Sequence, residues 1–103
     1  MYNLPQAEKT VRYTEQEKVI IYTAQYDDLS YLDCLSQLRW VQTKLVRAKH
    51  DLYNVLDIMH LTDHPSNDMK HMKYELTENI KDLTARVKSL NRRIYIYENK
   101  GNA

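Results

Sequence analysis

Five side chains of the types that bind metal ions gather in a short stretch near the middle of the chain: His60, Asp63, His64, Asp68 and His71. His60 and His64 are four residues apart, a spacing that places two imidazoles on one face of a helix. Pro65 disfavours helical geometry at His64, so the helix is expected to end before that spacing is used. The stretch also lacks the cysteines or intervening glutamate of recognised zinc motifs. We therefore expect a polar turn without metal or other cofactor, and metal binding by His60, His64 and His71 is the alternative.

Basic residues form the second group that could do chemistry. They fall in two runs: Arg39, Lys44, Arg47, Lys49 and His50, then Arg86, Lys88, Arg92 and Arg93. If the runs lie on two helices that fold back on each other, they meet in the half nearest the chain termini. Acidic residues gather toward the opposite end, so the formal net charge of +1 hides a lengthwise polarity. A basic half could contact nucleic acid, with Trp40 and Tyr95 stacking on bases, or an acidic surface of a protein. A solvated helix face explains the same charges, and no motif defines a nucleic-acid recognition element.

Tyrosine is abundant, with nine residues, whereas phenylalanine is absent. Six of the tyrosines lie near the chain termini: Tyr2, Tyr13, Tyr22, Tyr26, Tyr95 and Tyr97. Tyrosine offers a large contact area at small entropic cost and tolerates water at its hydroxyl. The tyrosines therefore indicate a protein-binding or dimer surface at that end, or core filling in a chain that lacks phenylalanine.

Catalytic signatures do not occur in the sequence. There is no glycine-rich phosphate loop, no nucleophile elbow and no HExxH motif. No spacing orders a serine, a histidine and an aspartate into a triad. We therefore expect a protein that is not an enzyme.

Two heptad patterns predict the helices that position these groups. From about Asp28 to His60, one heptad position holds Tyr31, Leu38, Leu45, Leu52 and Met59, and its partner holds Cys34, Val41, Ala48 and Val55. From about Asp68 to Glu98, the pattern is Leu76, Ile80, Leu83, Val87, Leu90, Ile94 and Tyr97. A stripe of this period stays on one side of a helix that packs lengthwise on another. Two long helices and a short link predict an antiparallel hairpin. β-branched residues alternating with leucine also favour parallel pairing of the second helix with its symmetry mate.

The segments flanking the hairpin are defined by caps and breakers. Asp27 or Asp28 can cap the first long helix, and Ser66 or Asn67 the second. The N-terminal segment is ambiguous, because Thr14 and Glu17 match a capping box while residues 19–23 have strand propensity. We favour a helix from Thr14, because Ile20, Ala24 and Tyr31 then have the spacing of one apolar helix face. The alternative is α+β, in which residues 19–23 pair with residues 94–97 as a small terminal sheet.

The first long helix carries more apolar surface than a hairpin can bury. Leu32, Leu35, Val46, Tyr53 and Leu56 widen its stripe toward one flank. Proteins rarely leave such patches bare, so the N-terminal segment or a second subunit is expected to cover them. The predicted fold is all-α and single-domain, with an N-terminal segment (1–27), a first helix (28–61), a turn (62–67), a second helix (68–98) and a tail (99–103). We expect assembly as a dimer or higher oligomer, with the dimer favoured.

Composition narrows the class of protein further. Cys34 is the only cysteine, so an internal disulfide is impossible, and its place on the apolar face predicts a buried thiol. The N-terminus has no signal-peptide core and no apolar run is long enough to span a bilayer, so we expect a soluble cytoplasmic protein that does not bind membranes. Residues encoded by AT-rich codons are frequent, which suggests a low-GC bacterium or its phage; a phage product would act in the host cytoplasm.

These observations favour a small protein-binding regulator or inhibitor that docks on a larger intracellular protein, as a phage product does on a host factor. The expected contact residues lie in the tyrosine-rich, basic half: Trp40, Arg47, Arg86, Arg92, Arg93, Tyr95 and Tyr97. Binding of nucleic acid through the same basic half is the alternative function.

Overall fold

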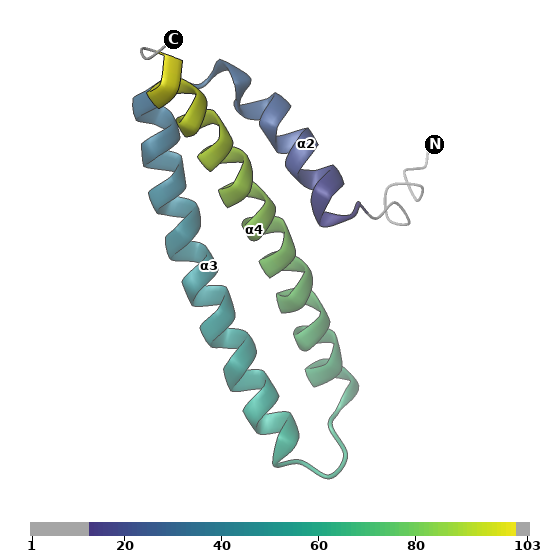
Figure 1. The fold of residues 1–103 in the computed structure, drawn as a ribbon. Coiled ribbons are helices and arrows are strands. Elements are labelled where there is room, and N and C mark those ends of the chain that lie inside the picture. The colour runs from purple at the N-terminus through teal and green to yellow at the C-terminus, as the bar shows by residue number, and fades with distance from the viewer. Residues whose placement is uncertain (1–12, 101–103) are drawn as a thin grey trace, which may run out of the picture.

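A computed structural model describes residues 13–100, which fold into helices joined by short links (Figure 1). The elements are α2 (Glu15–Gln25), the 3-10 turn η1 (Tyr26–Asp28), α3 (Tyr31–His60) and α4 (Asn67–Lys100). No strand occurs within residues 13–100, so the predicted all-α class is confirmed there and the terminal sheet is wrong. The outer parts of the expected N-terminal segment and tail, with Tyr2, lie outside the described residues.

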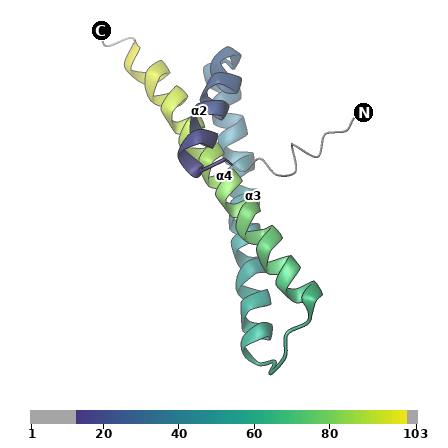
Figure 2. The same ribbon diagram turned by 90° about the vertical axis from the view of Figure 1, so that its right-hand side faces the viewer.

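Helices α3 and α4 lie side by side and run in opposite directions, with the link of residues 61–66 at one end (Figures 1 and 2). Pro65 lies in this link, where its missing N–H breaks no helical hydrogen bond. Ser66 begins α4 by accepting a hydrogen bond from the Met69 amide at 3.2 Å, which is one of the two caps expected there. The cap of α3 is Ser30, whose hydroxyl accepts from the Asp33 amide at 3.1 Å.

The expected start of the first long helix at Asp28 is therefore wrong by three residues. Asp27 and Asp28 belong to η1, and Leu29 is extended, so the chain turns between η1 and α3. Ser30 has the extended backbone of an N-cap, and its hydroxyl supplies the acceptor that either aspartate was expected to supply.

The N-terminal segment forms a helix because the capping box at its start is complete. The Thr14 hydroxyl accepts from the Glu17 amide, and the Glu17 carboxylate accepts from the Thr14 amide. Its apolar face differs from the expected one: Val19 and Tyr26 are buried, whereas Ile20 and Ala24 are exposed. Residues 19–23 have strand propensity, yet the cap and the burial of Val19 favour a helix, since tertiary packing overrides such propensities.

Helix α2 packs against α4, and α4 lies between α2 and α3 (Figure 1). Of the two covers expected for the surplus apolar flank of α3, the described part of the N-terminal segment, residues 13–27, packs on α4 instead, and the second subunit stays a prediction. The physical reason lies on α4, where Ala85 and Ser89 are fully buried. These small side chains leave room for the close approach of a second helix.

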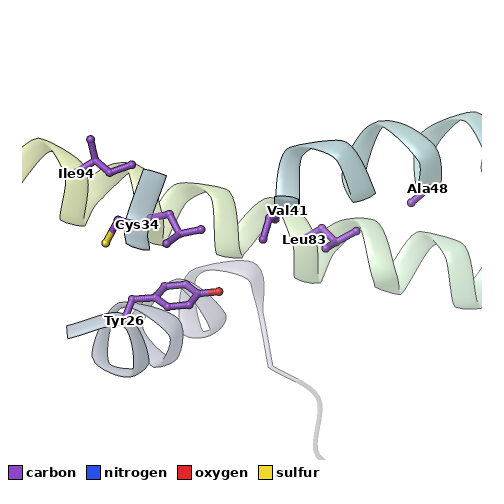
Figure 3. Packing of buried hydrophobic residues seen from close by; sticks show 7 residues of the cluster. Tyr26, Cys34, Val41, Ala48, Leu83 and Ile94 are labelled. Atoms are coloured by element: carbon purple, nitrogen blue, oxygen red, sulfur yellow. The ribbon is translucent and has the colours of Figure 1, made fainter. Parts of the chain in front are cut away.

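The core lies where all three helices meet, in the half of the α3–α4 pair that is far from the link. Figure 3 shows part of it, where Tyr26 lies beside the interface of α3 and α4 that holds Cys34 and Val41. On α4 the buried residues of this cluster are Leu83, Leu90 and Ile94. The predicted seam therefore faces inward, and the expected burial of Cys34 is confirmed.

Candidate protein-binding surface

A polar cluster joins α2 to α4 at the edge of the core. Asp82 accepts hydrogen bonds from the Tyr22 hydroxyl and from the Arg86 Nε, the latter at 3.0 Å. The Lys18 ammonium lies 3.5 Å from the same carboxylate. The Arg86 guanidinium also donates to the Tyr26 hydroxyl at 3.2 Å, and its Cζ lies 4.1 Å from the centre of the Tyr22 ring. Arg86 therefore fastens two helices together within this chain.

The pKa values of this cluster reflect that pairing. Burial and the hydrogen bond to Asp82 raise the pKa of Tyr22 to about 12. Burial acts to raise the pKa of Asp82 as well. However, the hydrogen bonds from Tyr22 and Arg86, with the charges of Arg86 and Lys18, lower it overall. Both groups thus keep the protonation states in which Tyr22 donates and Asp82 accepts across the physiological range.

Two more of the expected contact residues fasten η1 to α4. The Arg93 guanidinium pairs with the Asp27 carboxylate at 3.1 Å and donates to the Asp27 carbonyl at 3.2 Å. The Tyr97 hydroxyl donates to the Leu29 carbonyl. Arg93 and Tyr97 hold the chain in the turn that leads from η1 into α3.

Trp40 and Arg47 are placed differently, because both side chains are exposed on α3. They line an open groove of about 340 Å³ along one flank of the α3–α4 pair, together with Thr43, Lys44, Ala48, Asp51, Leu76 and Asn79. The Lys44 ammonium lies over the Trp40 indole, 4.3 Å from the ring centre. This cation–π contact holds an ammonium and an aromatic ring next to each other on the surface. We call Trp40, Lys44 and Arg47 the tryptophan groove.

The remaining two predicted contact residues lie on α4. Arg92 lines a separate hollow between α2 and α4, with Glu15, Gln16, Val19, Ile20, Lys88 and Asn91. Tyr95 is exposed. The structure thus divides the seven expected residues. Arg86, Arg93 and Tyr97 make contacts within the chain, Trp40 and Arg47 share one groove, and Arg92 and Tyr95 lie exposed on α4.

The surplus apolar residues of α3 lie on the flank opposite the tryptophan groove. Lys44 follows Val41 by three residues and so lies beside the Val41–Ala48 row of the seam. Leu35 and Leu56 follow Tyr31 and Leu52 by four residues and so lie beside the other row. Nothing within residues 13–100 covers the surplus flank, where Leu32 is 74% and Val46 69% exposed.

The histidine stretch is not brought together. His60 ends α3, His64 lies in the link, and His71 lies on α4 with its Nε2 3.9 Å from the Glu75 carboxylate. Within residues 13–100 no three histidine, cysteine, aspartate or glutamate side chains are grouped so that they could hold a metal ion. Cys34 is fully buried, and burial raises the pKa of its thiol, which disfavours the reactive thiolate.

Sequence reasoning did not single out Lys18, Tyr22 or Asp82 as a cluster. The spacing of Asp82 and Arg86 by four residues could have indicated that pair. Nothing in the spacing links these residues to Tyr22, which is sixty positions from Asp82. Lys44 was recognised only as one of the basic residues, and its contact with Trp40, four residues earlier, is also of helical spacing.

Comparisons of the chain with protein-family models, with curated proteins and with solved structures found no match. Among the helices that the structure describes, none has both the length and the apolar character needed to cross a bilayer.

Proposed function

We propose that this chain is a small, non-enzymatic regulator or inhibitor that binds a larger protein through the tryptophan groove. In this proposal the coiled-coil-like hairpin of α3 and α4 is a rigid support, and two copies of the chain associate. Trp40 and Arg47 are the contact residues, with Lys44 beside them. Arg86, Arg93 and Tyr97 support the surface by fixing α2 and η1 to α4.

The exposure of Trp40 is the observation that carries the proposal. Trp40 is 56% exposed to solvent, on a helix whose seam residues Cys34 and Val41 are fully buried. Tryptophan and arginine dominate the residues that contribute most to protein interfaces, because they bury a large area and form directional contacts. A ring flanked by Lys44 and Arg47 fits an aromatic or aliphatic side chain that is followed by a carboxylate.

The electrostatics of α3 indicate an acidic partner. Between Arg39 and His50 the helix carries four formal positive charges, on Arg39, Lys44, Arg47 and Lys49, and no acidic residue. Among the ion pairs found within residues 13–100, none involves these four side chains. Lys44 and Arg47 line the tryptophan groove, whereas Arg39 and Lys49 lie on the other flank of α3. A partner with an acidic surface would neutralise Lys44 and Arg47 directly, and the positive charge of all four side chains would steer it toward this helix.

The proposal is tested by capturing partners from an extract of the source cell on the immobilised chain. We expect a distinct protein to be retained by the wild type and lost with Trp40→Ala and with Arg47→Glu. Lys70→Glu is the matched control, because it makes the same change of charge at an exposed site of α4 and should retain the partner. Equal retention by all variants, or no retained protein, contradicts the proposal.

Nucleic-acid binding is the second candidate, since the same four basic residues could contact phosphates. A gel-shift assay at low and at moderate salt separates the two functions, because counterion release makes phosphate binding weaken steeply with salt. Retardation of duplex or single-stranded nucleic acid that is lost with Arg47→Glu favours this candidate. The absence of retardation at low salt excludes it.

A further inference from the structure

We propose that the outer flank of α3 is a second helix-packing seam, and that a second copy of this chain occupies it in the antiparallel direction. The inference specifies the self-association named above and does not depend on the tryptophan groove, which lies on the other flank. We call this set of residues the outer stripe: Leu32, Leu35, Arg39, Gln42, Val46, Lys49, Tyr53 and Leu56.

The outer stripe has the spacing of a coiled-coil seam. Its residues step along α3 by three, four, three, four, three, four and three positions, so they stay on one side of the helix for about 36 Å. All eight side chains are exposed. Helix α3 therefore carries two seams, of which α4 buries one and nothing within residues 13–100 covers the other.

The order of residues along the stripe is close to its own reverse. Two apolar residues, Leu32 and Leu35, begin it, and two more, Tyr53 and Leu56, end it. A two-fold axis at the level of residue 44 would place Leu32 against Leu56 of the second copy and Leu35 against its Tyr53. Two-fold dimers use the same patch on both subunits, so a patch that matches its own reverse suits a second copy of this chain.

The exposed area is sufficient for such a dimer. Three of the five apolar residues are more than 60% exposed: Leu32, Val46 and Tyr53. Together the five expose roughly 500 Å², so two copies would bring together roughly 1,000 Å², the lower limit of specific interfaces. We therefore expect a reversible dimer with a dissociation constant in about the micromolar range.

Like charges that face each other in this pairing weaken the dimer, and they also provide a test of its register. The same two-fold axis places Arg39 of each copy against Lys49 of the other, which gives two repulsive contacts per dimer. Exposed charges of like sign repel modestly, and salt screens them. We expect dimerisation to strengthen as the ionic strength rises, the reverse of what an acidic partner on this flank would show.

Charge reversal tests the proposed register. Arg39→Glu and Lys49→Glu should each tighten the dimer about fivefold to tenfold, because each creates two attractive pairs in place of two repulsive ones. The double variant should return to about the wild-type constant, since glutamate then faces glutamate. Arg47→Glu, which makes the same charge change on the opposite flank, should leave the constant unchanged. Sedimentation equilibrium gives the constants, and circular dichroism confirms that each variant is folded.

Cysteine cross-linking tests the direction independently. A mixture of Leu35→Cys and Tyr53→Cys chains should form a disulfide-linked dimer under mild oxidation, whereas neither variant alone should, because like positions are far apart in an antiparallel pair. The wild type, whose Cys34 is fully buried, is the control. Cross-linking of Leu35→Cys alone indicates a parallel pair and overturns the proposal.

Three results would overturn the inference without affecting the tryptophan groove. The first is that the wild type and Arg39→Glu both stay monomeric at about 100 µM. The second is that Arg39→Glu or Lys49→Glu alone weakens the dimer. The third is that the double variant forms a tighter dimer than either single variant. Loss of partner capture with Trp40→Ala, in a chain that still dimerises, would separate the two surfaces directly.

Discussion

The two ends of the α3–α4 pair share one heptad seam but differ in how much of it is buried. Near the chain termini α2 adds a third helix, and most of the buried side chains lie there, among them Cys34, Val41, Leu90 and Ile94. Toward the link, in residues 46–79, only Ala48 and Val55 are buried, and α4 has no buried residue before Leu83. A continuous hydrophobic pattern thus determines which face of each helix packs inward. How completely that face is buried depends on whether a third helix packs there.

This difference predicts where the chain is most stable. Local opening is easiest where few apolar side chains are buried. We therefore expect amides of residues 50–79 to exchange with solvent faster than those of residues 80–97.

Leu90→Ala should have the largest effect. Leu90 is fully buried where all three helices meet, and removing such a side chain leaves a cavity that costs about 2–5 kcal/mol. Met72→Ala is the control at the other end of α4, where the side chain is half exposed and the change should stay within about 0.5 kcal/mol. Urea unfolding measures both, and similar losses would mean that the two ends are equally well packed.

Asp82→Asn should come next, because Asp82 receives the hydrogen bonds that fasten α2 to α4. The neutral amide binds the Arg86 guanidinium and the Lys18 ammonium more weakly, and we expect a loss of about 1–2 kcal/mol. Asp68→Asn is the control, on the exposed first turn of α4. If the two variants lost equal stability, the Asp82 cluster would contribute nothing beyond a surface charge.

The same carboxylate predicts a dependence on acid. The pKa of Asp82 is lower in the folded chain than in the unfolded chain. The ionised carboxylate therefore stabilises the fold at pH values above the pKa of the unfolded chain, and this stabilisation is lost as the pH falls through the pKa of the folded chain. In the wild type the free energy of unfolding should therefore begin to fall below about pH 4, and the fall should be smaller in Asp82→Asn. Parallel acid titrations of the two proteins, followed by circular dichroism, measure the difference. Superimposable curves would contradict the expectation.

Ser89→Ala should cost less, about 0.5–1 kcal/mol. The Ser89 oxygen lies 2.9 Å from the Val19 carbonyl of α2 and 2.9 Å from the Ala85 carbonyl of its own helix, and its single proton serves one at a time. Alanine removes this link between helices, and its higher helix propensity offsets part of the loss. Ser36→Ala, at an exposed site of α3, should be neutral or slightly stabilising. Thermal unfolding compares the pair, and a stabilising Ser89→Ala would show that the link contributes nothing.

The smallest expected effect concerns Tyr22, whose hydroxyl donates to Asp82. The pKa of Tyr22 is raised to about 12 from the model-compound value of 10.0, so the folded state favours the protonated phenol. Its contribution is present below pH 10, and it is lost as the pH rises through about 12. Tyr22→Phe should be less stable at neutral pH, and its alkaline fall in stability should be smaller than that of the wild type, since the pKa of Tyr31 is raised as well. A Tyr22→Phe chain with the same fall above pH 10 would assign the effect to another group.

Much of the fold could be predicted because heptad spacing is a property of the chain itself. Leu83 and Val87 recur at intervals that only a lengthwise helix partner can bury, and Pro65 marks the link between the helices. The position of α2 could not be predicted in the same way. It depends on Ala85 and Ser89, which look unremarkable in sequence and acquire meaning only when a second helix approaches them.

In the candidate site, too, local spacing could be predicted from the sequence and contacts between distant residues could not. Arg86, Arg93 and Tyr97 have the residue types of contact sites, yet each donates a hydrogen bond to a residue sixty or more positions away in the sequence, in η1 or directly after it. Whether a basic or aromatic side chain faces solvent or a distant helix is decided by packing, not by its type. Trp40 and Arg47 could be identified as a pair because they lie on one helix, where a separation of seven residues fixes a shared face.

The sequence by itself determined that the described chain is helical, where its long helices lie and which stripes of α3 are apolar, because these follow from local periodicity, caps and breakers. Only the tertiary structure decided that α2 lies on α4, that three expected contact residues bind within the chain, and that no part of the described chain covers the outer stripe of α3. These outcomes depend on contacts between residues far apart in the chain, and helical periodicity carries no information about such distances.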